Sequence, residues 1–250
     1  IHKIRLEGGA VSVMRAVGDE LLVAAGATEQ TLACWRIGEG EPEVWRHAPR
    51  VWPNSFAISP DGKLLALGSA DTIVRVLNAR NGQTLFTGVG HKDAVTAVAW
   101  SHDSRTLATG SADASVILWD VADTKRKSEL REVRSTVTAL AFSDDSRRIA
   151  VAAVDLSVRV FDLHSSRLEK KLFGHTKPVE ALRFHPKGWL LASVGRDGTL
   201  GLWSIKRGIG HCLIEASHQA LSCVAFSPDG NLLVAGGLDK TLRVWSVSRV

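Results

Sequence analysis

The sequence predicts an all-β protein built from repeated antiparallel sheets, and three observations lead to this prediction. First, an acidic residue recurs in a tight turn at a constant step of 42 residues: Glu29, Asp71, Asp113, Asp155, Asp197 and Asp239. Second, a large apolar residue follows each acid six positions later: Trp35, Leu77, Trp119, Phe161, Trp203 and Trp245. Third, turn sequences such as Ser59-Pro60-Asp61-Gly62 separate short apolar runs, which is typical of β-hairpins. Self-similarity at such a period indicates a repeat architecture.

Each repeat is expected to contain four short strands. In the third repeat these are residues 84–87, 95–100, 106–110 and 115–120, joined by turns and without a helical period. Four strands in about 40 residues, repeated around a centre, favour a β-propeller, here with six blades. Residues 1–6 are expected to form the last strand of the final blade. Pairing them with residues 242–247 would close the ring and remove exposed sheet edges.

The composition indicates an ordinary globular chain, with 45% hydrophobic and 23% charged residues among 250. No linker interrupts the period, so residues 1–250 are interpreted as a single domain of six 42-residue repeats. No apolar run approaches the ~20 residues of a membrane span, and the start lacks the apolar core of a signal peptide. We therefore expect an intracellular protein, cytoplasmic or nuclear. Because the chain does not begin with Met, a removed signal stays open.

The three cysteines, Cys34, Cys212 and Cys223, form no CxxC pair and no metal-ligand spacing. We expect free thiols in a reducing compartment and no metal site.

Specific motifs then resemble WD40 repeats over essentially the whole chain: the pairs Gly90-His91 and Gly174-His175, the column of turn acids, and Trp119-Asp120. The resemblance implies a structural hydrogen-bonded set of His, Ser or Thr, Asp and Trp in a repeat. Two repeats keep the full set: His91, Thr109, Asp113 and Trp119 in the third, and His175, Ser193, Asp197 and Trp203 in the fifth. In the second and fourth repeats apolar residues replace the partners, so Asp71 and Asp155 are expected only to cap their own turns.

The number of repeats departs from the family, whose members most often have seven blades. Six repeats are compatible with a true six-bladed ring, or with a ring from which one unit is missing or supplied by a partner. The constant step of 42 residues also fits a shortened or engineered propeller.

The sequence predicts no catalytic residue, no metal and no cofactor. Catalysis in a propeller would need acids or histidines at the inner-strand starts, which are expected to face the central channel. The six residues at this position are all apolar: Val11, Pro53, Val95, Val137, Val179 and Leu221. His91 and His175 are interpreted as members of the structural sets, because a buried polar group is usually a hydrogen-bonded one.

A non-enzymatic scaffold for protein–protein interactions follows, either a monomer or a subunit of a larger complex. The candidate partner-binding residues lie on one face: Arg50, Trp52, Lys92, Arg134, Lys177 and Arg196. Trp52 stands alone among small neighbours at the mouth of the ring, so a peptide with acidic flanks would fit this basic rim. Nucleic acid is disfavoured because no aromatic platform accompanies the charges.

Four alternatives to this binding face stay open. The charges can be a solvated surface, and Trp52 can simply cover Pro53. The opposite face, with Trp189 and Lys125–Lys127, is the next candidate for binding. An engineered scaffold without a native partner is the alternative function.

Overall fold

The computed structural model describes residues 11–17, 21–26, 31–36, 43–47, 53–205 and 211–247, and the side chains of residues 53–205 and 212–247. The regular secondary structure in these residues consists of 23 β-strands. The first sheet contains β1 (Val11–Val17), β2 (Leu21–Gly26), β3 (Thr31–Arg36) and β4 (Glu43–His47). The second contains β5 (Pro53–Ile58), β6 (Leu64–Ser69), β7 (Val74–Asn78) and β8 (Thr84–Gly88). The third contains β9 (Val95–Trp100), β10 (Thr106–Ser111), β11 (Val116–Asp120) and β12 (Lys125–Leu130).

The same pattern continues toward the C-terminus. The fourth sheet contains β13 (Val137–Phe142), β14 (Arg148–Ala153), β15 (Val158–Asp162) and β16 (Arg167–Leu172). The fifth contains β17 (Val179–Phe184), β18 (Leu190–Gly195), β19 (Thr199–Ser204) and β20 (His211–Glu215). The sixth contains three described strands, β21 (Leu221–Phe226), β22 (Leu232–Gly237) and β23 (Leu242–Ser246). The prediction of an all-β fold with repeated four-stranded antiparallel sheets is confirmed.

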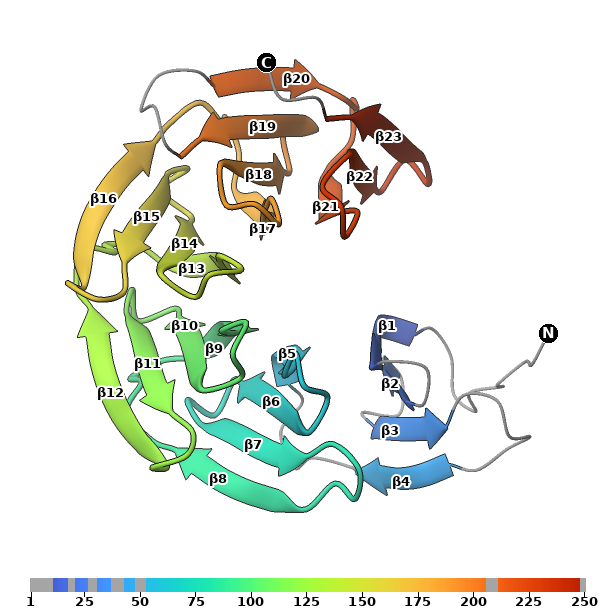
Figure 1. Ribbon diagram of the computed structural model, residues 1–250, viewed down its shortest axis with the longest axis vertical. Helices are drawn as coiled ribbons and strands as arrows, with labels where there is room; N and C mark the ends of the chain where they lie inside the picture. The colour runs from blue at the N-terminus through green and yellow to red at the C-terminus, as the bar shows by residue number, and fades with distance from the viewer. Residues whose placement is uncertain are drawn as a thin grey trace.

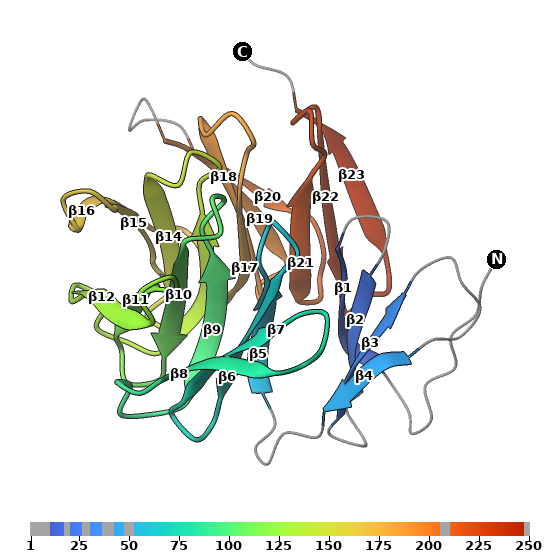
Figure 2. The same cartoon turned by 60° about the horizontal axis from the view of Figure 1, so that its bottom comes forward.

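The sheets lie side by side around a common centre, with the first strand of each sheet innermost and the fourth outermost (Figure 1). Inner strands of consecutive sheets contact one another: β5 with β9, β9 with β13, β13 with β17, and β17 with β21. Turning the molecule shows these inner strands standing along the axis of the arc (Figure 2). The first and sixth sheets are its two ends. The predicted closure by residues 1–6 lies outside the described residues.

The hydrophobic core lies between neighbouring sheets. Val74 and Val76 of β7 pack in one cluster with Val95, Val98 and Trp100 of β9, in the next sheet. The second strands of the second to fifth sheets, β6, β10, β14 and β18, are covered on both faces and are therefore almost completely buried. Such strands appear in the sequence as apolar runs rather than as alternating patterns. Within the described residues no helix has the length and apolar character required to cross a membrane.

A β-bulge begins the inner strand of the second to sixth sheets. In the third sheet Val95 is opposite Ser111 and Ala97 is opposite Gly110, so Thr96 is the extra residue. A bulge redirects the side chains beside it. The bulged residues of the third to sixth sheets line the central cavity: Thr96, Thr138, Glu180 and Ser222.

This bulge corrects the predicted channel lining. The preceding residues, Val95, Val137, Val179 and Leu221, are fully buried in the core between sheets. The prediction that they face the channel was wrong by one residue, because a regular alternation does not include the extra residue.

Candidate functional site

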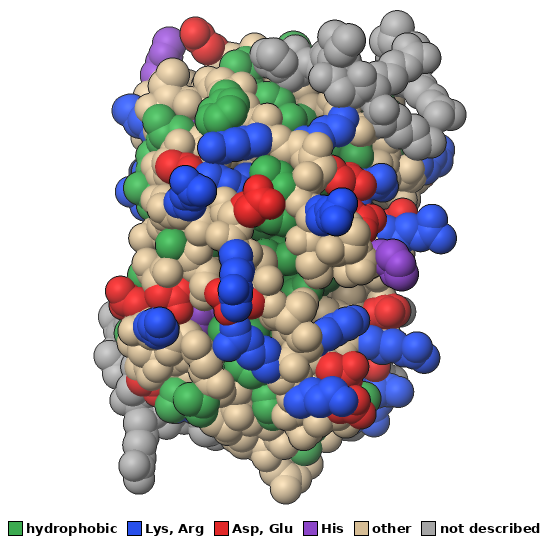
Figure 3. All heavy atoms as spheres, turned by 90° about the vertical axis from the view of Figure 1, so that its left-hand side faces the viewer, with side chains coloured by type: hydrophobic (Ala, Val, Ile, Leu, Met, Phe, Trp, Pro, Cys, Tyr) green, Lys and Arg blue, Asp and Glu red, His purple; other side chains and the backbone are tan. Residues whose placement is uncertain are grey.

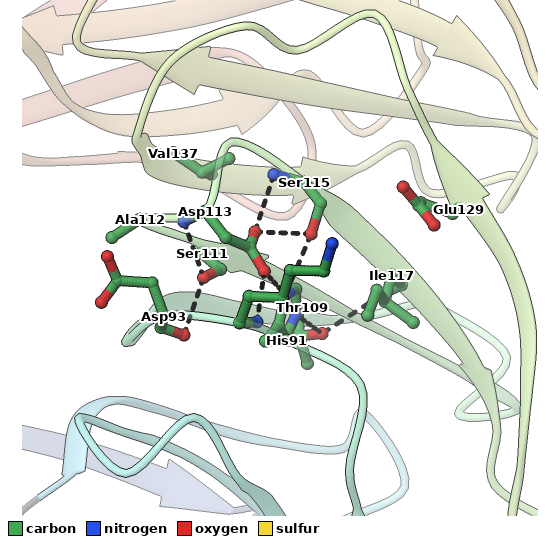
Figure 4. Close-up of polar contacts among 12 residues, drawn as sticks. His91, Asp93, Thr109, Ser111, Ala112, Asp113, Ser115, Ile117, Glu129 and Val137 are labelled. Atoms are coloured by element: carbon green, nitrogen blue, oxygen red, sulfur yellow. Dashed lines mark hydrogen bonds and ion pairs between the residues drawn. The ribbon is translucent and has the colours of Figure 1, made fainter.

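The turn acid of the third sheet lies in a hydrogen-bonded set built from three segments (Figure 4). The Nδ1 atom of His91 lies 3.1 Å from Oδ2 of Asp113, and its Nε2 atom lies 2.8 Å from Oγ1 of Thr109. The indole Nε1–H of Trp119 donates to the same Thr109 oxygen over 2.8 Å. The connection from β8 to β9 contributes His91, β10 and β11 contribute Thr109 and Trp119, and the turn between them contributes Asp113.

The protons of this set can be assigned from its partners. Asp113 accepts hydrogen bonds from the backbone N–H groups of Lys92 and Ser115, at 2.7 and 2.9 Å. Burial raises the pKa of Asp113, but the hydrogen bonds from Ser115 and Lys92 outweigh burial and lower this pKa to about 2. Burial also lowers the pKa of His91. A neutral His91 then donates through Nδ1 to the carboxylate and accepts through Nε2 from Thr109. Neither ring nitrogen is left to take a substrate proton, so the set is structural.

The fifth sheet repeats this arrangement. His175 lies 3.0 Å from Asp197 through Nδ1 and 2.7 Å from Ser193 through Nε2. The indole of Trp203 donates to the Ser193 hydroxyl over 2.8 Å. Burial raises the pKa of Asp197, whereas hydrogen bonds from the backbone N–H groups of Thr176 and Thr199 lower it, and the net shift is downward. The structure thus brings together all eight residues of the two predicted sets.

The second, fourth and sixth sheets use a different partner for the acid, an arginine four residues later. The arginine Nη2 and carboxylate Oδ2 atoms are separated by 2.6 Å in Asp71–Arg75, 2.5 Å in Asp155–Arg159 and 2.7 Å in Asp239–Arg243. The acids also accept from backbone N–H groups of their own turns, those of Ile73, Ser157 and Thr241. The prediction that Asp71 and Asp155 only cap their turns was therefore wrong.

In the fourth sheet the arginine of this ion pair is buried. Arg159 is only 2% exposed, and it also donates to the Ser157 hydroxyl over 2.6 Å. Burial raises the pKa of Asp155, but hydrogen bonds from Arg159 and Ser157 lower it to about 2. A charged pair takes the place of the histidine, and the carboxylate is fully satisfied in both kinds of sheet.

One sequence position separates the two kinds of sheet. The residue four places after the acid is, from the second sheet to the sixth, Arg75, Ile117, Arg159, Gly201 and Arg243. An arginine occurs wherever the histidine set is absent. In the fifth sheet a Cβ atom on Gly201 would lie 2.5 Å from Ser193 Oγ, so the local geometry of this sheet leaves no room for a side chain, whereas the third sheet accommodates Ile117 beside its set. The residue type at this position is visible in the sequence and is the signal, missed in the sequence analysis, that distinguishes ion-paired acids from acids in a histidine set.

The turn-acid face is defined here as the loops 89–94, 131–136, 173–178 and 216–220 together with the turns that carry the acids. Lys92, Arg134, Lys177 and Arg196 all lie on it and are all exposed. Arg196 forms an ion pair with Glu180, whereas the other three have no ion pair with any described residue. Arg50 and Trp52, the remaining predicted partner-binding residues, lie outside the described residues.

Two exposed apolar side chains that directly precede turn acids on the same face were not predicted. Val154 is 46% exposed and Leu238 is 67% exposed, each directly before a turn acid. In the sequence they occupy the same position of the repeat as the small residues Ala70 and Ala112. Only the structure shows that this position faces solvent.

The outer strands, in contrast, mix both signs of charge (Figure 3). The run Lys125–Lys127 is partly neutralised, because Lys125 pairs with Asp123 and Arg126 pairs with Glu129. Arg148 and Glu169 form a further pair on this side. The surface of the outer strands therefore carries charges of both signs and is not one basic patch.

The central cavity has a volume of about 830 Å³. Its lining includes Glu180, Asp144 and His102, so the expectation that only apolar residues face the channel was wrong. Glu180, however, forms an ion pair with Arg196. Among the described residues, no group of three or more His, Cys, Asp or Glu side chains could hold a metal ion.

Repeated four-stranded sheets around a centre, with a satisfied acid in the same turn of the second to sixth sheets, define a protein of the propeller-repeat class. Comparison with protein families agrees, because five segments match the family described as "WD domain, G-beta repeat": residues 45–78, 82–120, 127–162, 166–204 and 210–246. The chain therefore belongs to the WD40 family. WD40 repeats typically mediate protein–protein interactions, and WD40 domains bind protein partners.

A segment of 77 residues is 30% identical to the nuclear distribution protein PAC1 of Coccidioides posadasii. This match spans 31% of the present chain and 16% of that protein. The likeness thus concerns repeat units rather than the whole relative.

Proposed function

We propose that the chain is a non-enzymatic WD40 scaffold that holds an acidic protein or peptide partner on the turn-acid face. The observation that carries this proposal is the distribution of charge on that face. The turn acids direct their carboxylates into hydrogen bonds and ion pairs with their own sheets. Lys92, Arg134 and Lys177 are exposed and have no ion pair with a described residue. Asp93 and Glu132 are exposed carboxylates in the same loops, but these acids are fewer than the three cations, so the net free charge on the face is basic, which attracts acidic partners.

The same geometry supports a role without catalysis. Both nitrogens of His91 and His175 are hydrogen-bonded within their sets, and the carboxylate of Glu180 is paired with Arg196. A general acid or base needs a group that can reach the substrate and exchange a proton with it. We place this scaffold inside the cell, in the cytoplasm or the nucleus, as a monomer or as one subunit of a complex.

Charge reversal tests the binding face. Arg134→Glu and Lys177→Glu should weaken capture of a partner at least tenfold, and raising the salt concentration should weaken capture by the unmodified protein. Lys127→Glu, on the exposed outer strand β12, is the matched control and should have little effect. Trp52→Ala should also weaken capture while leaving the melting temperature unchanged. Equal loss with all variants would contradict the proposed face. The absence of any specific partner would favour an engineered scaffold.

Ring closure by six blades is part of the same proposal. Leu242 and Val244 of β23 are 75% and 60% exposed, whereas their counterparts in the fourth sheet, Val158 and Val160, are 1% and 0% exposed. A face with this sequence is suited to packing against another sheet, and β23 is an edge strand among the described residues. We propose that residues 1–6 pair with β23. Deleting them should lower the stability and promote association; unchanged melting and a clean monomer would contradict closure.

A further inference from the structure

Three consecutive sheets present a row of unlike side chains at one position of the turn-acid face. Val154, Arg196 and Leu238 each directly precede a turn acid, in the fourth, fifth and sixth sheets. Val154 is 46% exposed and Leu238 is 67% exposed, while 63% of the Arg196 side chain is accessible. The second and third sheets have Ala70 and Ala112 at this position. The row is therefore apolar, basic, apolar, and it is confined to one half of the arc.

The backbone holds this row in place. The N–H groups of Val154, Arg196 and Leu238 donate to the carbonyls of Thr136, Pro178 and Ala220, each over 2.9 Å. These acceptors lie in the loops that lead into the inner strands. Each residue of the row thus occupies a fixed place beside its loop, and a partner meets a surface that requires little ordering.

The neighbouring charges are the cations of the loops. Arg134 lies two residues before Thr136, and Lys177 directly precedes Pro178, so both lie in loops bonded to the row. Neither has an ion pair with a described residue. Asp155, which directly follows Val154, is neutralised by Arg159. Between the two apolar contacts lies Arg196, whose exposed side chain is paired with Glu180, and beside them lie Arg134 and Lys177, which are not paired with a described residue.

We propose that this row binds an extended peptide segment in which two apolar residues flank several acidic residues. The inference rests on the proposed scaffold function and specifies its partner. Packed sheets lie about 10 Å apart, and an extended chain advances about 3.3 Å per residue. Contacts two sheets apart, at Val154 and Leu238, therefore require apolar residues about six positions apart, with the acids between them opposite Arg196. Such spacing distinguishes this segment from a uniformly acidic one.

A nucleic acid fits the row less well. Its bases would need aromatic side chains on which to stack, and the three residues of the row include none. An anionic membrane surface would be attracted by the charges but would not depend on two apolar residues at a fixed spacing.

Labelled synthetic peptides test the proposal on the unmodified full chain. The probe is a ten-residue peptide with leucines at positions 2 and 8 and glutamates between them. One comparison peptide replaces both leucines by serine, and another moves them to adjacent positions. We expect the probe to bind at least fivefold more tightly than either, measured by fluorescence anisotropy.

Substitutions then locate the binding. Val154→Ser and Leu238→Ser should each weaken the probe at least fivefold, while Leu85→Ser on β8, which is 50% exposed, is the matched apolar control. Loss with Leu85→Ser, equal binding of all three peptides, or no binding of the probe would overturn the proposal. So would equally strong binding of an oligonucleotide or an anionic vesicle.

The two proposals fail in distinguishable ways. If Arg134→Glu abolishes capture of a natural partner while Val154→Ser and Leu238→Ser have no effect, the scaffold function stands and the apolar specificity fails. If charge reversal has no effect on capture or on the probe, the scaffold face itself fails.

Discussion

The third and fourth sheets follow the same chain path but satisfy their turn acids with different chemistry. Asp113 belongs to a set completed by a buried neutral histidine, whereas Asp155 pairs with a buried arginine from its own sheet. Both carboxylates also accept hydrogen bonds from their own turns, and both have pKa values lowered to about 2. The fold therefore requires an ionised, satisfied acid at this turn and not one particular partner.

The largest effect is expected in the fourth sheet. Asp155→Ala leaves Arg159 buried without its carboxylate, and breaking a buried ion pair in this way costs about 3 kcal/mol. Urea unfolding at neutral pH measures the loss. The double variant Asp155→Ala/Arg159→Ile, which copies the apolar residue Ile117 of the third sheet, should regain most of the stability. A double variant as unstable as Asp155→Ala alone would show that the buried arginine is not the cause.

A smaller loss is expected in the fifth sheet. Asp197→Ala removes an acceptor shared by His175 and by the backbone N–H groups of Thr176 and Thr199, at a cost of about 2 kcal/mol. No buried charge remains, so the cost should stay below that of Asp155→Ala. Asp123→Ala, in an exposed ion pair with Lys125, is the control and should change the unfolding midpoint little. The reverse order of the two large effects would contradict the comparison.

The fifth sheet should not tolerate a side chain at the position that Ile117 occupies in the third sheet. Gly201→Ala places a Cβ atom 2.5 Å from Ser193 Oγ and 2.8 Å from the Trp203 ring, and such overpacking costs about 1–3 kcal/mol. Adding Ser193→Ala removes the nearest contact, so the double variant should lose less than the sum of the single losses. Additive losses would indicate that Ser193 is not the group with which the new methyl group clashes.

The smallest effect is a difference in pH dependence. Burial lowers the pKa of His91 in the folded chain below its ordinary value of about 6.5. As the pH falls below this value, the unfolded chain therefore takes up a proton at His91 before the folded chain does. The stability that depends on neutral His91 is present above this pH and is lost as the pH falls through the folded pKa. The lowered pKa values of Asp113 and Asp155 act later, between the ordinary carboxyl range and about pH 2.

A histidine variant tests this order. His91→Gln should be less stable at pH 7 but should lose less additional stability than the unmodified protein between pH 7 and 5.5. Asp155→Asn should leave that part of the pH profile unchanged. Parallel profiles for His91→Gln and the unmodified protein would exclude His91 as the titrating group.

The repeat predicted much of the fold because its signal is local and recurs. For the third repeat the expected strands 95–100 and 106–110 agree with β9 and β10 within one residue. The members of both histidine sets followed from a resemblance at fixed spacing. The sequence repeat and the sheet are offset by one strand. Residues 84–88, expected as the first strand of the third repeat, pair with β7 and form the last strand of the second sheet.

The parts that sequence reasoning missed depend on packing in three dimensions. The bulge at Thr96 shifts the channel lining by one residue, and a two-residue period contains no sign of it. Arginine is usually a surface residue, and nothing in the local sequence indicates that Arg159 is only 2% exposed in the fold. Val154 and Leu238 are apolar residues at positions that the fold exposes, which no hydrophobic pattern distinguishes from core.

The exposed apolar side of β23 has a consequence for how the molecule responds to concentration. If residues 1–6 pair with this edge, they do so from the same chain, and short tethers give effective concentrations of about 1 mM. A second molecule at micromolar concentration would compete about a thousandfold less well for the same edge. The chain would therefore remain monomeric while residues 1–6 are present, and loss of this segment would be sufficient to make its stability depend on concentration.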